Sequence, residues 1–279
     1  MRQLPMIFLD QPIRRHDLLA VELSALDLVL EPLRRKVRHS RQLIESPLAA
    51  VRKDGEQIAL PRYIFSGPGG GGDPIRIGIF AGIHGDEPAG AYAVLQLVEL
   101  LEAAPILAEG YHLFLYPVCN PTGFVDATRC SRTGRDLNRE FWKNSQEPEV
   151  ILLEQEIRTR AFHGLVSLHT DDTSEGLYGF VRGAVLTRAL LEPALAAAEK
   201  VLPRNLSLII DGFSAQNGII SECYDGILTS PPELHPQPFE IILETPHAAP
   251  LTQQAQALVV AIRAVLAEYQ KFLAFAANL

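Results

Sequence analysis

The alternation of apolar strands with helices is the feature that most constrains the fold of this chain. Residues 75–83, IRIGIFAGI, form an unbroken apolar run rich in β-branched residues, which is typical of a strand buried on both faces. A helical pattern follows at 89–104 and begins after Pro88, a residue suited to the first turn of a helix. Strands that alternate with helices predict a mixed, mostly parallel central sheet flanked by helices, in the α/β class.

The other elements are predicted from the same patterns. Strands are expected at 57–66, 111–118, 164–170, 177–183, 206–212 and 238–245, and further helices at 148–162, 187–202 and a terminal amphipathic segment around 258–272. The glycine-rich stretch 66–74 lacks the Lys-Ser/Thr pair of a phosphate loop and is expected to be a flexible connection. Residues 25–48 also look helical. We therefore expect a helical N-terminal segment (1–50) packed on a catalytic domain (51–279).

Charge and cysteine content exclude several classes of protein. The formal net charge of −8 argues against a chain that neutralises nucleic-acid phosphates. The three cysteines are scattered and odd in number, which is typical of a reducing compartment. The sequence shows no apolar stretch of membrane-spanning length and no signal-peptide pattern near Met1. We expect a cytoplasmic protein without nucleic-acid or membrane partners, and the oligomeric state stays open.

Three residues at strand ends could bind a metal ion. His84 and Glu87 lie three apart in a turn between the strand at 75–83 and a helix, and they supply two of the three protein ligands of a typical catalytic zinc. His169 ends the strand at 164–170, and ligands from separate parallel strands meet beyond their carboxyl ends. Taken singly, each residue also has a structural explanation. Glu87 could be an acid that is favourable at a helix N-terminus, and His169 could be a hydrogen-bonded histidine at a strand edge.

Further motifs follow in a fixed order. HGDE at 84–87 is followed by Asn120-Pro121-Thr122-Gly123-Phe124, Thr128-Arg129, Asp136-Leu137-Asn138-Arg139, SLH at 167–169 and ETP at 244–246. Together these motifs resemble the zinc carboxypeptidase family, over roughly residues 57–279. The resemblance includes the succinylglutamate desuccinylase and aspartoacylase branch of that family.

The resemblance implies a catalytic centre with one zinc ion. His84, Glu87 and His169 match the zinc ligands, and Arg129 matches the arginine that polarises the scissile carbonyl. Glu244 matches the general base that assists attack by the metal-bound water. These roles agree with general chemistry, because a glutamate beside such a water can accept its proton and later deliver it to the leaving amine. Cobalt or nickel would suit the same ligands.

Other residues are implied to bind or orient. Asn138 and Arg139 match the pair that binds the terminal carboxylate of a substrate, a task that suits the planar guanidinium. Asp136 would orient His84. Tyr224 is the nearest candidate for the family's mobile-loop tyrosine, although a packed loop tyrosine is the alternative. We expect His247, three residues after Glu244, to be structural.

Three functions remain open. The first is a zinc-dependent hydrolase that cleaves an amide bond next to a free carboxylate in a small molecule or peptide, as a carboxypeptidase does. The second is an N-acyl-amino-acid deacylase, since the short interval between Glu87 and His169 resembles that branch as well as bacterial members of the family. However, only 35 residues follow Glu244, too few for the extra β-rich domain usual in that branch. The third is a catalytically silent binding module, against which the full set of ligands, base and arginines argues.

Overall fold

The structure is a computed structural model that describes residues 24–51, 57–69, 72–183 and 187–276 of the 279-residue chain. Residues 1–23 of the predicted N-terminal segment and residues 70–71 of the glycine-rich connection lie outside the described residues. Within that part of the chain, no helix combines the length and the apolar character needed to cross a bilayer.

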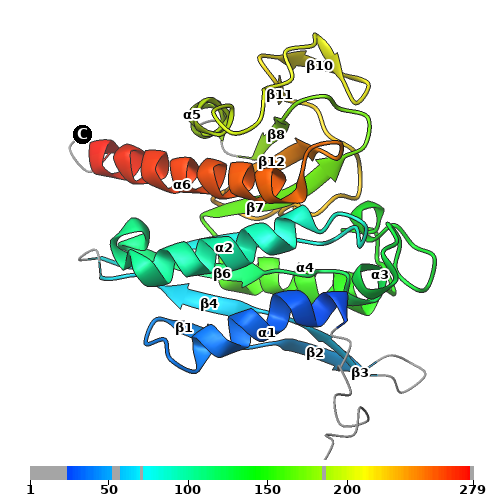
Figure 1. The fold of residues 1–279 in the computed structure, drawn as a ribbon, viewed down its shortest axis with the longest axis vertical. Coiled ribbons are helices and arrows are strands. Elements are labelled where there is room, and N and C mark those ends of the chain that lie inside the picture. Colours follow the sequence, from blue (N-terminus) through cyan, green and yellow to red (C-terminus); the bar gives the residue numbers. More distant parts are fainter. Residues whose placement is uncertain (1–23, 52–56, 70–71, 184–186, 277–279) are drawn as a thin grey trace, which may run out of the picture.

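A ten-stranded sheet forms the centre of the molecule (Figure 1). In spatial order its strands are β1 (Leu43–Glu45), β4 (Tyr63–Ser66), β6 (Tyr111–Tyr116), β5 (Ile75–Ala81), β7 (Gly164–Asp171), β12 (Phe239–Pro246), β8 (Tyr178–Gly183), β11 (Ile219–Ile220), β10 (Phe213–Gln216) and β9 (Ile209–Ile210). The four strands β6, β5, β7 and β12 are mutually parallel, whereas antiparallel pairs predominate toward both edges. The predicted α/β class with a mixed sheet is therefore confirmed.

Helices cover both faces of this sheet (Figure 1). Four of them form one layer by packing side by side: α1 (Ala25–Val37), α2 (Ala89–Ala103), α6 (Leu251–Ala276) and α5 (Thr187–Ala198). On the other face lies α4 (Pro148–Arg160), which also contacts the separate two-stranded sheet of β2 (Leu48–Val51) and β3 (Gln57–Leu60).

The central strands are apolar throughout because they are buried on both faces. In β5, Ile77, Ile79 and Ala81 pack into the core under the α1–α2–α6–α5 layer, while Phe80 packs into the opposite core with α4 residues. Since successive side chains of a strand point to opposite faces, an unbroken apolar run is what such a position requires. The prediction of a doubly covered strand at 75–83 is thus confirmed, with the strand ending at Ala81.

Several predicted elements differ from the structure. The helix expected at 25–48 ends at Val37, because Ser40 Oγ accepts the N–H groups of Gln42 and Leu43 in a turn that leads into β1. The strand expected at 57–66 is divided at Pro61 into β3 and β4, which belong to different sheets. Of residues 206–212, only Ile209–Ile210 form a strand. The division of the chain at residue 50 stays a prediction.

Candidate active site

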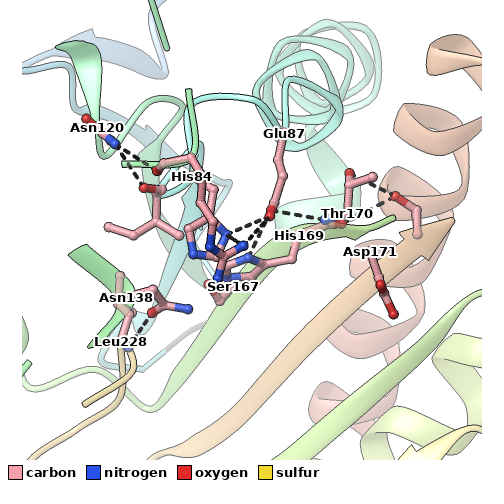
Figure 2. A network of polar contacts seen from close by, with 12 residues as sticks. His84, Glu87, Asn120, Asn138, Ser167, His169, Thr170, Asp171 and Leu228 are labelled. Carbon is pink, nitrogen blue, oxygen red and sulfur yellow. Dashed lines mark hydrogen bonds and ion pairs between the residues drawn. The ribbon is translucent and has the colours of Figure 1, made fainter. Parts of the chain in front are cut away.

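The three predicted metal ligands meet at the carboxyl end of the sheet. His84 and Glu87 lie in the turn between β5 and α2, and His169 lies in β7, the parallel neighbour of β5. One potential ligand atom from each residue lies within 4.8 Å of the others, and all three residues are buried. Figure 2 shows their side chains converging from separate elements. We call this cluster of His84, Glu87 and His169 the candidate metal centre.

The motif Asn120-Pro121-Thr122-Gly123-Phe124 (NPTGF) stabilises the turn that carries His84. Asn120 begins α3 (Pro121–Asp126), where its side chain accepts the N–H of Gly123, and its amide nitrogen donates to the carbonyl oxygen of Ile83. Gly85 donates its N–H to the carbonyl oxygen of Thr128 at 3.0 Å. The NPTGF motif therefore has a structural role: it supports the turn that presents His84 and Glu87.

Gly85 is expected to be intolerant of a side chain. A Cβ atom at this position would lie 1.9 Å from the backbone carbon of Gly123, so one of the two segments would have to move. Gly85→Ala should lower the free energy of unfolding by ~1–3 kcal/mol, the usual cost of overpacking, as measured by urea denaturation. Gly72→Ala is the matched control, because a Cβ there meets no atom within 4 Å. Equal stabilities of the two variants would contradict this prediction.

Glu87 connects the two histidines of the candidate metal centre. Its Oε1 lies 2.6 Å from His84 Nδ1, and its Oε2 lies 3.0 Å from His169 Nδ1 and accepts the N–H of Thr170. The outer nitrogens are also held: His84 Nε2 lies 3.3 Å from Asp136 Oδ1, and His169 Nε2 lies 3.1 Å from Ser167 Oγ. Both rings therefore direct Nδ1 to the same point. Two such nitrogens and one carboxylate fit a divalent ion such as zinc, with the outer contacts that metal-bound histidines usually have.

The protonation of these groups also suits a cation. Burial opposes the charged form of Glu87, yet His169 and His84 together hold the pKa of its carboxyl well below the ordinary value. Burial lowers the pKa of His169 despite the nearby Glu87, which favours the neutral imidazole that a metal requires. For His84, burial is outweighed by the hydrogen bonds to Asp136 and Glu87, so its pKa is raised. The carboxylates that raise this pKa would equally attract a metal ion.

Glu244 lies in the same cavity as the candidate metal centre. It belongs to β12, which pairs in parallel with β7 so that Glu244 stands beside His169 in the register. Both residues line a cavity of 360 Å³. Burial and the negative charges of Glu87, Asp171 and other acids raise the pKa of Glu244 well above its ordinary value. A carboxyl group whose pKa is raised in this way is suited to exchange protons with a bound molecule.

Arg129 approaches the candidate metal centre from the loop after α3. Its Nη1 lies 3.6 Å from Glu87 Oε1 and 3.3 Å from His84 Nδ1, and its Nε donates to Asp136 Oδ2 at 3.0 Å. Asp136 therefore contacts both Arg129 and His84. The side chain of Arg129 is 44% exposed, and it also lines the cavity. Its guanidinium is thus placed to reach an anion bound beside the metal centre.

The predicted substrate-binding residues line another part of the cavity. Asn138 Oδ1 accepts the N–H of Leu228, a contact drawn in Figure 2, and the two atoms lie 2.9 Å apart. The guanidinium carbon of Arg139 lies 4.3 Å from the ring centre of Tyr224, and the Tyr224 hydroxyl donates to Asp211 Oδ1 at 2.8 Å. The structure therefore brings every predicted site residue to this region. The roles given to them stay predictions.

Other residues of the cavity were not predicted as site residues. His247 is exposed at the cavity wall, although a structural role was expected for it. Asp171, Tyr178 and Asp211 also line the cavity, and the Tyr178 hydroxyl donates to Asp171 Oδ2. A sequence signal exists for Asp211, since the Asp-Gly pair at 211–212 is typical of turns and both residues have positive φ angles. Nothing in that pair indicates a place beside Tyr224.

Comparison with known proteins shows which family the chain resembles. Residues 74–208 match the sequence model of the succinylglutamate desuccinylase/aspartoacylase catalytic domain. The predicted family resemblance is thereby confirmed. A 103-residue stretch of this desuccinylase/aspartoacylase-like chain, 31% of its length, is 29% identical to carboxypeptidase SOL1 of Arabidopsis thaliana. That match spans only 21% of the plant protein.

Solved structures share the fold of this desuccinylase/aspartoacylase-like chain. A candidate metallopeptidase from Shewanella denitrificans superposes with a TM-score of 0.71 and 22% identity, covering 87% of this chain and 90% of that one. A metallocarboxypeptidase from Pseudomonas aeruginosa, in complex with (2-guanidinoethylmercapto)succinic acid, gives a TM-score of 0.61 with 15% identity, covering 86% and 68% of the two chains. The central sheet and its helices are thus those of a metallocarboxypeptidase-like fold.

Proposed function

We propose that the protein is a zinc-dependent hydrolase that cleaves an amide bond next to a free carboxylate, as a carboxypeptidase does. The observation that carries this proposal is the meeting of His84, Glu87 and His169 around one point, with Glu244 in the same cavity. The family match supports a hydrolase of this type. We retain one zinc ion per chain and a cytoplasmic location as further predictions.

Each polar residue of the cavity then has a task. A zinc ion in the candidate metal centre would supply Lewis-acid polarisation and lower the pKa of water. Glu244 would accept a proton from the attacking water and deliver it to the leaving amine. Arg129 would donate hydrogen bonds to the oxygen on which negative charge develops. Asp136 would hold the His84 ring through Nε2.

The carboxylate of the substrate would be bound at the other end of the cavity. Arg139 and Asn138 lie there, and the stacking of Arg139 on the Tyr224 ring orients the guanidinium. A planar guanidinium can bind a carboxylate with two parallel hydrogen bonds. Carboxylate binding at this end would place the adjacent amide bond near Glu244.

An N-acyl-amino-acid deacylase is the second candidate. The specific observation in its favour is the match of residues 74–208 to the succinylglutamate desuccinylase/aspartoacylase catalytic domain. The same cavity residues would serve, because the product of either reaction is an amino acid with a free carboxylate. The two candidates differ in what lies on the other side of the scissile bond.

A substrate panel with and without a chelator tests both functions. We expect the zinc-loaded protein to hydrolyse peptides with a free terminal carboxylate, not their amidated forms, and to lose at least ~10²-fold in kcat/KM on chelation. Added zinc should restore the rate. Preferential hydrolysis of N-acyl amino acids would favour the deacylase. Metal and carboxylate binding without any turnover would instead indicate the silent binding module.

A further inference from the structure

A second cavity, of 750 Å³, adjoins the candidate active-site cavity. It lies between residues 171–176, which run from the last residue of β7 toward β8, and residues 203–211, which include the edge strand β9 and precede β10 (Figure 1). Asp171, Thr173 and Asp211 line both cavities. These three residues therefore form the boundary across which a bound molecule could extend from one cavity into the other. We call the second cavity the outer cavity.

Apolar side chains form one wall of the outer cavity. Leu206, Ile209 and Ile210 line it, and Leu206 and Ile209 are 68% and 62% exposed. Single exposed apolar residues are common on protein surfaces, but a group of them that lines a cavity beside a candidate active site suggests contact with a ligand. A bound molecule that places apolar groups against this wall would therefore bind more tightly, because apolar surface is removed from water.

The charge of the outer cavity is negative. Three carboxylates line it, those of Asp171, Glu175 and Asp211. The cation that lines it, Arg204, is already paired, since its Nη1 and Nε lie 2.8 Å from Glu192 and Glu199 respectively. An anion would meet uncompensated repulsion there, whereas an ammonium or guanidinium group would be attracted.

The two boundary carboxylates are held in place by tyrosines. The Tyr178 hydroxyl donates to Asp171, and the Tyr224 hydroxyl donates to Asp211. Burial, together with the negative charge of Asp171, raises the pKa of Asp211, although Tyr224 opposes this shift. The two acids therefore repel each other, and a cation between the cavities would relieve this repulsion.

We propose that the outer cavity is a substrate subsite for an extended chain that carries a positively charged group, on the side of the scissile bond away from the bound carboxylate. This inference rests on the proposed hydrolase function and specifies its substrate as a peptide of several residues. Arg129 and Arg139 would attract the carboxylate end, while Asp171 and Asp211 would attract the cationic part. A short anionic acyl group such as succinyl would leave the apolar wall unused and meet the carboxylates.

Peptide kinetics test the subsite. With tetrapeptides that share one C-terminal residue and carry lysine, glutamine or glutamate before it, kcat/KM should fall in that order, by at least ~10-fold from lysine to glutamate. The lysine tetrapeptide should also exceed the matching dipeptide. Glu175→Gln and Ile209→Ser should each reduce the ratio of tetrapeptide to dipeptide kcat/KM by ~10-fold. A wild-type protein that prefers the glutamate peptide, or shows no preference for length, would overturn the proposal.

Two control variants separate the subsite from general surface effects. Asp73→Asn removes an exposed acid just before β5, and Ile106→Ser removes an apolar side chain that is 62% exposed in the short 3₁₀ helix Pro105–Ala108. Both positions lie at the opposite end of the sheet from the candidate active site. Neither change should alter the tetrapeptide-to-dipeptide ratio, and a fall equal to that of the subsite variants would count against the proposal.

Binding provides a readout that does not need turnover. Calorimetric titration with the lysine tetrapeptide is done on zinc-loaded Glu244→Gln protein, which should bind the peptide with little cleavage. The Kd should be ~10-fold weaker when Glu175→Gln or Ile209→Ser is added to this variant. If no substrate is hydrolysed, the hydrolase function fails but this titration still decides the subsite. Equal Kd values for Glu244→Gln with and without each added substitution would overturn the subsite even if the protein proves to be a hydrolase.

Discussion

Replacing Glu244 with glutamine is expected to lower kcat by ~10³-fold, within the range that general acid–base groups contribute, while the metal content stays that of the wild type. The reason is that Glu244 shares the cavity with His84, Glu87 and His169 but makes no hydrogen bond with them among the described residues. Glutamine keeps the shape of the side chain and cannot accept the proton. Steady-state kinetics and elemental analysis of the metal measure the two outcomes.

Stability separates a catalytic role of Glu244 from a structural one. Because burial and the charges of Glu87, Asp171 and Asp211 already disfavour its carboxylate, the neutral glutamine should give a Tm no lower than that of the wild type. Glu99→Gln, on the exposed side of α2, is the control that should leave kcat unchanged. Undiminished turnover in Glu244→Gln would remove the proposed mechanism, and a large fall in Tm would indicate a structural role.

Replacing His169 with alanine is expected to abolish stoichiometric metal binding. His169 Nδ1 and His84 Nδ1 flank the Glu87 carboxylate, so the variant would leave two protein ligands of the three that catalytic zinc sites usually have. Titration of the metal-free protein with zinc measures the affinity. Activity should fall with metal content, and added zinc should not restore it fully.

A graded series makes the metal prediction sharper. Asp136→Asn retains all three ligands but weakens the partner of His84 Nε2, so its zinc affinity should fall by ~10–100-fold, the usual cost of such a change. His169→Ala should lose more than that. His39→Ala, an exposed histidine after α1, should bind zinc as the wild type does. Unaltered zinc affinity in His169→Ala would show that the ion, if any, binds elsewhere.

The main features of the fold could be predicted because long elements carry clear periodic patterns. The strand at 75–81 and the helices at 89–103 and 251–276 are buried over many residues, and burial imposes the pattern of apolar side chains. Short elements carry no such pattern. Leu43–Glu45 has only three residues, and its pairing with β4 depends on contacts distant in the sequence.

Residues 206–212 show why apolar content can mislead. Their apolar side chains give the pattern of a buried strand. However, Leu206, Leu208 and Ile209 are exposed, so this pattern does not reflect burial in the core. Only two residues of this stretch pair in the sheet. The place of Asp211 beside Tyr224 depends on this irregular segment, and local sequence does not specify it.

The candidate metal ligands could be proposed from residue type and strand position, but their convergence was implied by the family motifs. Glu87 and His169 are 82 residues apart in the sequence, and the parallel pairing of β5 with β7 brings them into contact. Glu244 is added by the next parallel strand, β12. The order of the motifs along the chain predicts which residues meet, and the strand order explains how they do so.

The pairing of β7 with β12 has a consequence for engineering this protein. Adjacent strands lie about 4.8 Å apart, a spacing set by backbone hydrogen bonds, so the separation of His169 from Glu244 does not depend on any loop. Residues 172–176 and 203–208, by contrast, are connections outside the strands. Segments of other lengths and compositions could be inserted at both connections to obtain new selectivities, while the reacting groups keep their relative positions.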